Sequence, residues 1–530
     1  MSEYELSRRQ FVGGSLAASL LTGMQIESRA EDAEDGAKYR MFWGDIHNHN
    51  EVGYAKGSLA RSIDNAQEHL DFFAFTGHSS WHDMPKMPED RHMKWVNGFK
   101  VQADHWPKTR QMIREANTED FTALLGYEWH SSRFGDYCMI FPDDQPDLYL
   151  PDHVEKLLDF AESKGAMAVP HHVAYARGWR GANFDHFRPS ASPIVEIFSE
   201  HGCSESVTAS GPFIRHSMGG RDTVNTIQRQ LEKGLRFGFA ASSDSHRGYP
   251  GAYGEGVVGV WARDLSAASL FEAFRARRTC AATGDRIVLD VTLNGQPMGS
   301  QISSVSEREI DVSAQGQDAI AMIELVRNGA VIHRHFPEDH FDGRLKLPGK
   351  TKCRIRYGWG PWAALDLGRT CLWDMDVRID GGQFTAAVPC FQSAPYEEDL
   401  RDRLRIVSPT HLHLASYTSR VKCFAEDPTK AIVCELDAGP DAVMSITLRK
   451  PCEQTVKTRL ADLKNDNQIT FTGGFTTESF MIHPLLAPEE YTADLRFQDR
   501  RPADQGTDWY YVRVTEKNGH MAWSTPIWVG

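Results

Sequence analysis

The stretch that decides the fold is MFWGDIHNHNEVGY, residues 41–54, in which a short apolar run ends at two histidines two residues apart. On an extended strand, residues two apart point to the same side, so His47 and His49 can reach one common point. The same spacing recurs in two other pairs, His333/His335 and His411/His413. Spacing alone therefore does not identify a metal site, and the sequence around each pair has to decide.

Later apolar segments repeat the pattern of the first one. They are DFFAFTGHS (71–79), FTALLGYEW (121–129), AMAVPHH (166–172), SPIVEIFSEHG (192–202) and RFGFAASSDSH (236–246). Continuous apolar runs are typical of strands buried on both faces of a parallel sheet. Helical patterns alternate with them; in 58–70, Ser58 is the expected cap and Leu59, Ile63 and Ala66 share one face. Because strand ends meet on one face of a parallel α/β barrel, the sequence predicts a barrel over residues 40–286 whose mouth gathers these polar residues.

The length of 530 residues favours two or three domains. From residue 287 onward, alternating segments joined by Asn-Gly predict hairpins, and one or two β-sandwich-like modules over 287–530. The net charge of −14 argues against nucleic acid or an anionic membrane as the main partner. Nine scattered cysteines without a C-x-x-C pair argue against a zinc finger and favour mostly buried structural thiols.

Residues 1–30 read as an export signal rather than as part of the fold. SRRQFV (7–12) carries paired arginines, a Gly/Ala/Ser-rich run follows, and Ser28-Arg29-Ala30 offers a small-x-small cleavage site. The apolar run is too short and too glycine-rich for a membrane span. We therefore expect a twin-arginine signal, export by the twin-arginine machinery, and a periplasmic or otherwise exported protein.

Imidazoles and carboxylates at strand ends suit Zn, Mn or Fe. Asp244 and His246 repeat the two-residue spacing of His47 and His49, and Glu128 offers a carboxylate that can bridge two ions. The pairs at 333/335 and 411/413 lie in strand-rich sequence without a matched acid, so we expect them to be structural.

Five motifs in order, GDIHNHN, FTGHS, GYEW, VPHH and SSDSH, resemble the polymerase and histidinol phosphatase (PHP) superfamily of metal-dependent phosphoesterases over residues 40–285. The later RRTCAATGDRI (277–287) and the β-rich tail look like a largely uncharacterised branch of it. The resemblance implies a distorted seven-stranded β/α barrel with one to three divalent ions. It further implies that the first ion is held by His47, His49, Glu128 and Asp244, the second by Glu128 and His171, and the third by His78 and His246.

The sequence departs from that family pattern at three places. The usual Thr-Asp-His is Thr76-Gly77-His78, which lacks a supporting carboxylate. No clear ligand follows the first pair, where the loop offers Glu51, Tyr54 and Lys56 instead. Between Glu128 and His171 another ligand is expected, and His130 and Tyr137 are the two alternatives.

Further residues are candidates for catalysis and substrate binding. His171 is preferred to His172 as the ligand, which leaves His172 for substrate contact or support, and His201 for a ligand, an acid or a loop residue. Glu128 and Asp244 join them as candidate catalytic groups. Arg247, Arg277 and Arg278 are candidates to clamp a phosphate, against the alternative of solvated or paired surface charge.

The leading hypothesis is an exported metal-dependent hydrolase that cleaves a small-molecule or oligomeric phosphoester with metal-activated water. One alternative is amidohydrolase-like C–N or C–O hydrolysis, which a bridging lysine would favour, and no lysine stands at a predicted strand end. The other is a non-catalytic envelope protein that binds polysaccharide through its Trp-rich half.

Overall fold

The computed structural model describes residues 27–31, 38–208, 222–343, 345–360, 370–422, 427–502 and 506–530. Strand β1 (Glu27–Glu31) contains the predicted cleavage site and pairs with β2 (Lys38–Asp45). Most of the predicted signal, residues 1–26, lies outside the described residues. In the described part of the chain, no helix combines the length and the apolar character needed to cross a bilayer.

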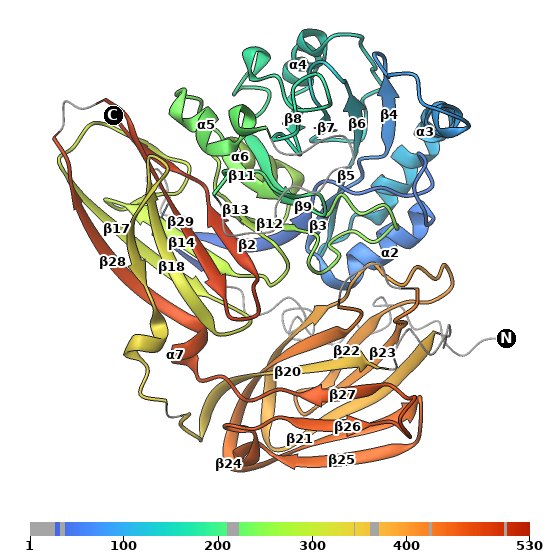
Figure 1. Ribbon diagram of the computed structural model, residues 1–530, viewed down its shortest axis with the longest axis vertical. Coiled ribbons are helices and arrows are strands. Elements are labelled where there is room, and N and C mark those ends of the chain that lie inside the picture. Colours follow the sequence, from blue (N-terminus) through green and yellow to red (C-terminus); the bar gives the residue numbers. More distant parts are fainter. Residues whose placement is uncertain are drawn as a thin grey trace.

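Residues 38–286, here called the front half, contribute strands to three separate sheets. Strands β2, β3 (Phe72–Ala74) and β5 (Thr122–Leu124) are parallel neighbours in the largest sheet. A second sheet has the order β4 (His78–Trp81), β6 (Gly126–His130), β7 (Tyr137–Ile140), β8 (Met167–Pro170), and these strands lie near the top of Figure 1. The third joins β10 (Gly202–Cys203), β9 (Ile194–Ser199) and β11 (Gly238–Ala241).

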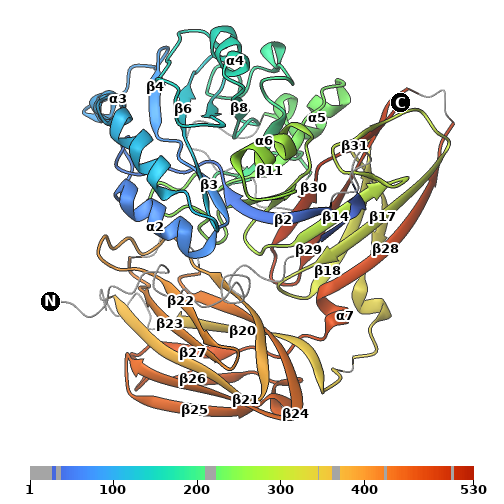
Figure 2. The same cartoon turned by 180° about the vertical axis from the view of Figure 1, so that it is seen from behind.

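Helices accompany these strands. Helix α2 (Leu59–His69) begins where the sequence predicts, because the Ser58 side chain accepts a hydrogen bond from the Arg61 amide. Four more helices belong to this half: α3 (Arg91–Ala116), α4 (Val154–Ser163), α5 (Ile227–Glu232) and α6 (Ala267–Arg275). Seen from behind in Figure 2, α2 and α3 lie on one side of this half and α5 on the other, with α4 between them at the top.

The predicted seven-stranded β/α barrel is wrong, because strands predominate over helices and the described sheets are open. Two pairings account for this. Strand β7 lies antiparallel between β6 and β8, so a hairpin replaces a parallel step with a crossover helix. Strand β13 (Thr279–Ala282) pairs with β12 (Val257–Ala262) on one side and with β30 (Met521–Ser524) on the other, which extends the sheet instead of closing it.

The largest sheet therefore crosses the predicted boundary at residue 287. Its remaining strands are β16 (Gln301–Ile302), β18 (Ile320–Arg327), β19 (Ala330–His335), β29 (Asp508–Glu516) and β31 (Ile527–Val529). The smaller sheet beside it consists of β15 (Gln296–Pro297), β14 (Val288–Leu293), β17 (Glu307–Gln315) and β28 (Thr492–Arg500), and the short α7 (Pro488–Tyr491) precedes β28. The Asn-Gly turns at 294–295 and 328–329 are confirmed, with positive φ at all four residues.

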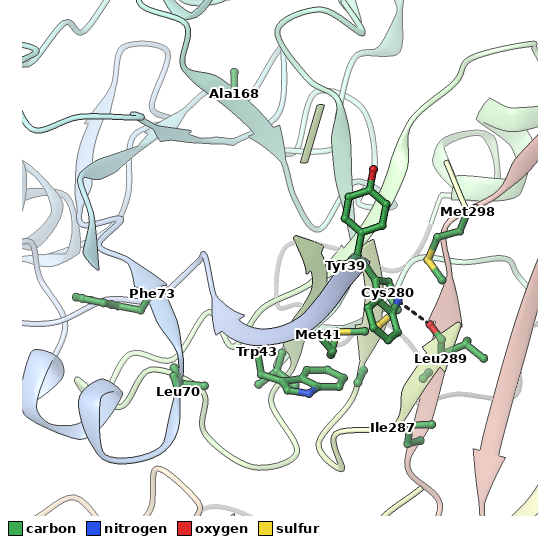
Figure 3. Close-up of a cluster of buried hydrophobic side chains, with 14 of the residues drawn as sticks. Tyr39, Met41, Trp43, Leu70, Phe73, Ala168, Cys280, Ile287, Leu289 and Met298 are labelled. Carbon is green, nitrogen blue, oxygen red and sulfur yellow. Dashed lines mark hydrogen bonds between the residues drawn. The ribbon is translucent and has the colours of Figure 1, made fainter. Parts of the chain in front are cut away.

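One buried core joins the front half to the C-terminal strands. Met41 and Trp43 of β2 pack with Cys280, Leu289 and neighbouring side chains (Figure 3). The Trp261 indole also donates a hydrogen bond of 3.1 Å to the Leu289 carbonyl. Since burying one large apolar side chain contributes roughly 1.5–3 kcal/mol, this core ties the C-terminal strands firmly to the front half.

The stretch from 349 to 482 forms an eight-stranded sheet, here called the inserted module (Figure 1). Its strands are β20 (Gly349–Trp359), β21 (Cys371–Cys390), β22 (Arg403–Ser408), β23 (His411–Thr418), β24 (Lys430–Lys450), β25 (Gln454–Arg459), β26 (Gln468–Phe471) and β27 (Ser479–Ile482). It contacts the front half through Ser58–Glu398 (3.0 Å) and Tyr249–Asp402 (2.8 Å).

Seven of the eight described cysteines are buried, and all eight are free thiols. This confirms the expectation of mostly buried structural cysteines for the described residues.

Candidate metal centre

The first and last motifs are held together by backbone hydrogen bonds. The two loops form a parallel bridge at Asn48 and Ser245, in which the His49 amide donates to the Ser245 carbonyl (2.9 Å) and the Asp244 amide to the His47 carbonyl (2.7 Å). Asp244 has a φ of 54°, a strained conformation for a residue other than glycine. The bridge thus places the two spaced pairs, 47/49 and 244/246, side by side.

Glu128 lies at the centre of a group of imidazoles. Its Oε1 is 2.8 Å from His171 Nε2 and 3.1 Å from His130 Nε2, and its Oε2 is 3.2 Å from His78 Nε2 and 3.6 Å from His49 Nε2. These side chains come from strands β4 and β6 and from the loops after β2 and β8. One carboxylate therefore stands between four imidazoles from four segments of the chain.

Asp244 forms a second centre next to the first. Its Oδ1 is 2.9 Å from His49 Nε2 and 3.3 Å from His47 Nε2, and its Oδ2 is 2.9 Å from His201 Nε2. His49, His78 and His246 form a further group whose ligand atoms lie within 4.8 Å of one another. Since His49 contacts both Glu128 and Asp244, the two carboxylates mark adjacent positions.

The donor atoms fit divalent ions. His47 Nε2, His130 Nε2 and Glu128 Oε2 are buried and make no hydrogen bond within the described structure. Buried polar atoms are ordinarily paired, so atoms that converge without a hydrogen bond indicate a missing partner. Neutral imidazoles with carboxylates are the donor set of Zn, Mn and Fe. Clusters of His, Glu and Asp in the described residues thus fit a site for divalent metal ions.

The pKa shifts of His47, His78, Glu128 and Asp244 agree with this donor set. Burial lowers the pKa of His47 and His78 well below the usual value, which keeps both imidazoles neutral. Burial alone would raise the pKa of Glu128, but the surrounding imidazoles, His130 and His78 first, hold it well below the usual value. For Asp244 burial is likewise outweighed, first by His47 and then by His201, so its pKa is also low. Both carboxyl groups are therefore anionic.

A second layer of polar groups orients the ligands. Glu196 Oε2 lies 3.0 Å from His47 Nδ1, and the Ser80 carbonyl lies 3.0 Å from His130 Nδ1. Asp136 accepts hydrogen bonds from the buried Arg180 guanidinium, including one of 2.5 Å from Nε, and lies 3.4 Å from His172 Nε2. Such hydrogen-bond partners fix which nitrogen of each imidazole ring would face a bound ion. Glu196, Asp136 and Arg180 were missed by sequence reasoning, because no spacing links them to the motifs.

The structure places the candidates of the two open ligand questions differently with respect to Glu128. Between Glu128 and His171, His130 lies against Glu128, whereas the Tyr137 ring packs in the core near Trp129. Period-two spacing from Glu128 on β6 is the signal that could have singled out His130. At VPHH, His171 contacts Glu128, and His172 stacks on Tyr175 with ring centroids 4.3 Å apart.

Gly77 is a glycine because no side chain fits there. A Cβ at this position would lie 2.4 Å from the Val52 carbonyl oxygen, 2.6 Å from the Phe75 ring and 2.7 Å from Gln102 Oε1. The aspartate of the usual Thr-Asp-His pattern has no room in this packing. The fold around His78 therefore does without that carboxylate.

The three predicted arginines lie in different surroundings. Arg247 follows His246 and reaches Ser393 Oγ (3.0 Å), Glu255 (3.5 Å) and Glu200 (3.8 Å) near the centre. Arg277 donates to the Gly299 carbonyl, and Arg278 pairs with Glu272 and lies over the Tyr39 ring. Arg247 is thus linked to His246 through Glu200, whereas Arg277 and Arg278 have partners elsewhere.

The other His-x-His pairs lie in the β-rich half. His411 and His413 of β23 both contact Asp376 Oδ1, at 2.9 and 3.0 Å, and Arg449 pairs with the same carboxylate. His333 and His335 lie on β19, where the His333 ring packs against Phe497. Both pairs thus lie on strands that are separate from the metal centre.

No family model matches the chain. It is 26% identical over 339 residues to an uncharacterized protein of Chlamydia trachomatis serovar D, a match that covers 56% of this chain and 49% of that protein, and equally similar to one of Chlamydia muridarum. A protein of Chlamydia pneumoniae is 27% identical over 267 residues, 46% of this chain and 43% of that one. The chain spans about half the length of the curated relatives it matches.

Among solved structures, the chain is similar to a two-domain protein of Bacteroides vulgatus described as containing a predicted PHP-like metal-dependent phosphoesterase. The identity is 15%, the match covers 57% of this chain and 83% of that chain, and the TM-score is 0.33. A likeness at this TM-score does not establish a shared fold or a shared activity, so the residues of the centre have to carry the functional argument.

Proposed function

We propose that the protein is a metal-dependent hydrolase that cleaves phosphate esters. The observation that carries the proposal is the pair of adjacent anionic centres, Glu128 among four imidazoles and Asp244 among three. Adjacent sites that share bridging ligands suit two ions acting on the attacking and leaving oxygens of one displacement. The ordered motifs of the PHP superfamily in the same segment support this reaction class.

The bound ions would supply Lewis acidity and a more acidic water molecule near neutral pH. The protein's own part is to hold and orient. His47, His49, His78, His130, His171 and His246 with both carboxylates would hold the ions, and Glu196 orients the His47 ring. Arg180, against Asp136 and under the rings of Trp81 and Trp95, places one positive charge beside the ligands. That charge can stabilise an anionic phosphoryl group.

Of the predicted catalytic histidines, His201 is the one that reaches solvent. His201 Nε2 lies 2.9 Å from Asp244, and its side chain is 21% exposed. His172 lies behind it, with ring centroids 5.6 Å apart. An imidazole within reach of both solvent and the centre suits general acid–base catalysis.

The test is Asp244→Ala, which should lower both the bound metal and the hydrolysis of a generic phosphodiester while the fold is kept. Asp376→Ala is the matched control, because that carboxylate also lies between two histidines but on the inserted module. Elemental analysis gives the metal content, and a panel of phosphate, amide and carboxylic esters gives the reaction class. Metallated wild-type protein that is inactive on every phosphoester contradicts the proposal, and amide cleavage would point to amidohydrolase chemistry.

We also propose that the protein is exported, on the strength of the Arg8-Arg9 motif. Replacing both arginines by lysine should retain the protein in the cytoplasm, and fractionation of the cells measures this. Normal export of that variant would contradict a twin-arginine signal.

A further inference from the structure

We propose that the Tyr54 hydroxyl donates the proton that the leaving-group oxygen needs when the substrate ester is cleaved. This inference rests on the proposed function. Tyr54 lies in the loop after His47 and His49, at the place where the sequence lacks a further ligand. The residue as a whole is only partly buried, and its ring lies against His78 of the metal centre.

The Tyr54 ring is held between two other rings. Its centroid is 4.0 Å from that of His78 and 4.1 Å from that of Trp95. The two neighbouring rings are tilted against it, by 36° and 51°, and their packing limits the movement of the phenol. The hydroxyl lies 3.4 Å from His246 Nε2, so it points toward the group formed by His49, His78 and His246.

Helix α3 packs closely against the loop that carries Tyr54. A Cβ at Gly98 of α3 would lie 2.8 Å from the Gly53 carbonyl oxygen and 2.9 Å from Tyr54 Cβ, so only glycine allows this close approach. Gly53 itself has a φ of +142°, which other residues rarely adopt. The close packing at Gly53 and Gly98 therefore helps to hold Tyr54 beside the ligands.

The contacts of His246 place the hydroxyl at the edge of this group. His246 Nδ1 lies 2.8 Å from the Asp244 carbonyl, and Nε2 of the same ring lies 3.4 Å from the Tyr54 hydroxyl. If Nε2 held an ion, the phenol O–H would stand beside that ion as a donor for an oxygen of the substrate.

The step balances as R–O–PO₃²⁻ + H₂O → R–OH + HPO₄²⁻. The P–O bond to the leaving group breaks, and the leaving oxygen keeps the electron pair and receives the Tyr54 proton. The proton lost by the attacking water restores the phenol. The donor matters most where the leaving oxygen is strongly basic, as in an alkyl ester.

The experiment compares Tyr54→Phe with the wild type on an alkyl phosphate and on 4-nitrophenyl phosphate, which has a good leaving group. Loss of a general acid typically costs about 10²–10⁴-fold, so we expect this loss in kcat on the alkyl ester and little change on the nitrophenyl ester. The metal content by elemental analysis should equal that of the wild type. Tyr137→Phe is the control, because it removes a hydroxyl from the core beside Trp129 and should change none of the three readings.

Each other outcome has a distinct meaning. An equal loss on both esters, or no loss on either, overturns the donor role while leaving the hydrolase standing. A fall in metal content shows that Tyr54 is a ligand and also overturns it. Wild-type protein that cleaves neither ester removes the proposed function and the inference together.

Discussion

Replacing Glu128 by glutamine is the sharpest perturbation of the metal centre, because it changes charge without changing size. The carboxylate lies within 2.8–3.6 Å of four imidazole nitrogens. The amide keeps the shape of the side chain but offers one neutral oxygen where two anionic oxygens stood. The protein should fold normally and bind its ions much more weakly.

The expected loss follows from the position of Glu128. Changing a group that only orients a ligand costs 10–100-fold in metal affinity, or about 1.4–2.7 kcal/mol. Glu128 offers oxygens to both sides of the imidazole group, so the loss should reach at least the upper end, about 100-fold. If the wild type is studied at 100 times its Kd, bound metal stabilises it by about 2.7 kcal/mol, and the variant at the same free metal by about 0.4 kcal/mol.

The assay is unfolding of each protein with and without a chelator, together with elemental analysis after dialysis against buffered metal. The difference between the two conditions cancels any effect of the substitution on the metal-free fold. Glu255→Gln is the matched control, since Glu255 contacts Arg247 and Ser393 beside the centre but none of the imidazoles near Glu128. Equal metal content and equal chelator sensitivity in Glu128→Gln and wild type would refute the assignment of Glu128 as a shared ligand.

Three further predictions concern stability. Gly77→Ala should cost about 1–3 kcal/mol in the free energy of unfolding through overpacking, whereas Gly474→Ala, with open space around it, should be nearly neutral in the same urea titration. Burial lowers the pKa of His69 to about 3 from 6.5, so the unfolded chain binds the proton first as the pH falls. The stabilisation from the neutral imidazole is complete above pH 6.5 and falls by about 1.4 kcal/mol per pH unit as the pH drops toward 3. His69→Gln should therefore reduce the change of the urea midpoint between pH 7 and 4. Lys430→Met should lower the free energy of unfolding by about 3–5 kcal/mol, because it leaves the buried Asp402 without its cation. The exposed Lys156→Met should cost under about 1 kcal/mol in the same thermal unfolding assay. Equal losses in the two variants would contradict an effect of burial.

Local features of the front half were readable from the sequence. Ser58 caps α2 as its position before an amphipathic run predicts, and the Asn-Gly turns at 294 and 328 adopt positive φ. The apolar runs before His47, His78, Glu128 and His171 contain or adjoin strands. These features depend on neighbours a few residues away, which is the range over which side-chain periodicity and turn chemistry act.

The partners of the strands were not readable in the same way. An apolar run shows that a strand is buried but not which strand lies beside it. Strand β13 pairs with β30, more than two hundred residues later, and β7 inserts antiparallel between β6 and β8. The resemblance to a barrel family filled this gap with a closed ring, and the observed pairings replace that ring with open sheets.

By itself, the sequence determined which residues could form the centre, because imidazoles and carboxylates at strand ends carry that chemistry wherever the strands go. Only the tertiary structure decided that Glu128 faces His130 as well as His171, that Glu196 and Arg180 belong to the surroundings, and that position 77 has no room for a carboxylate. The physical reason is that coordination and steric fit depend on distances of a few ångströms between segments far apart in the chain. Those distances are set by long-range packing, which the order of residues does not display.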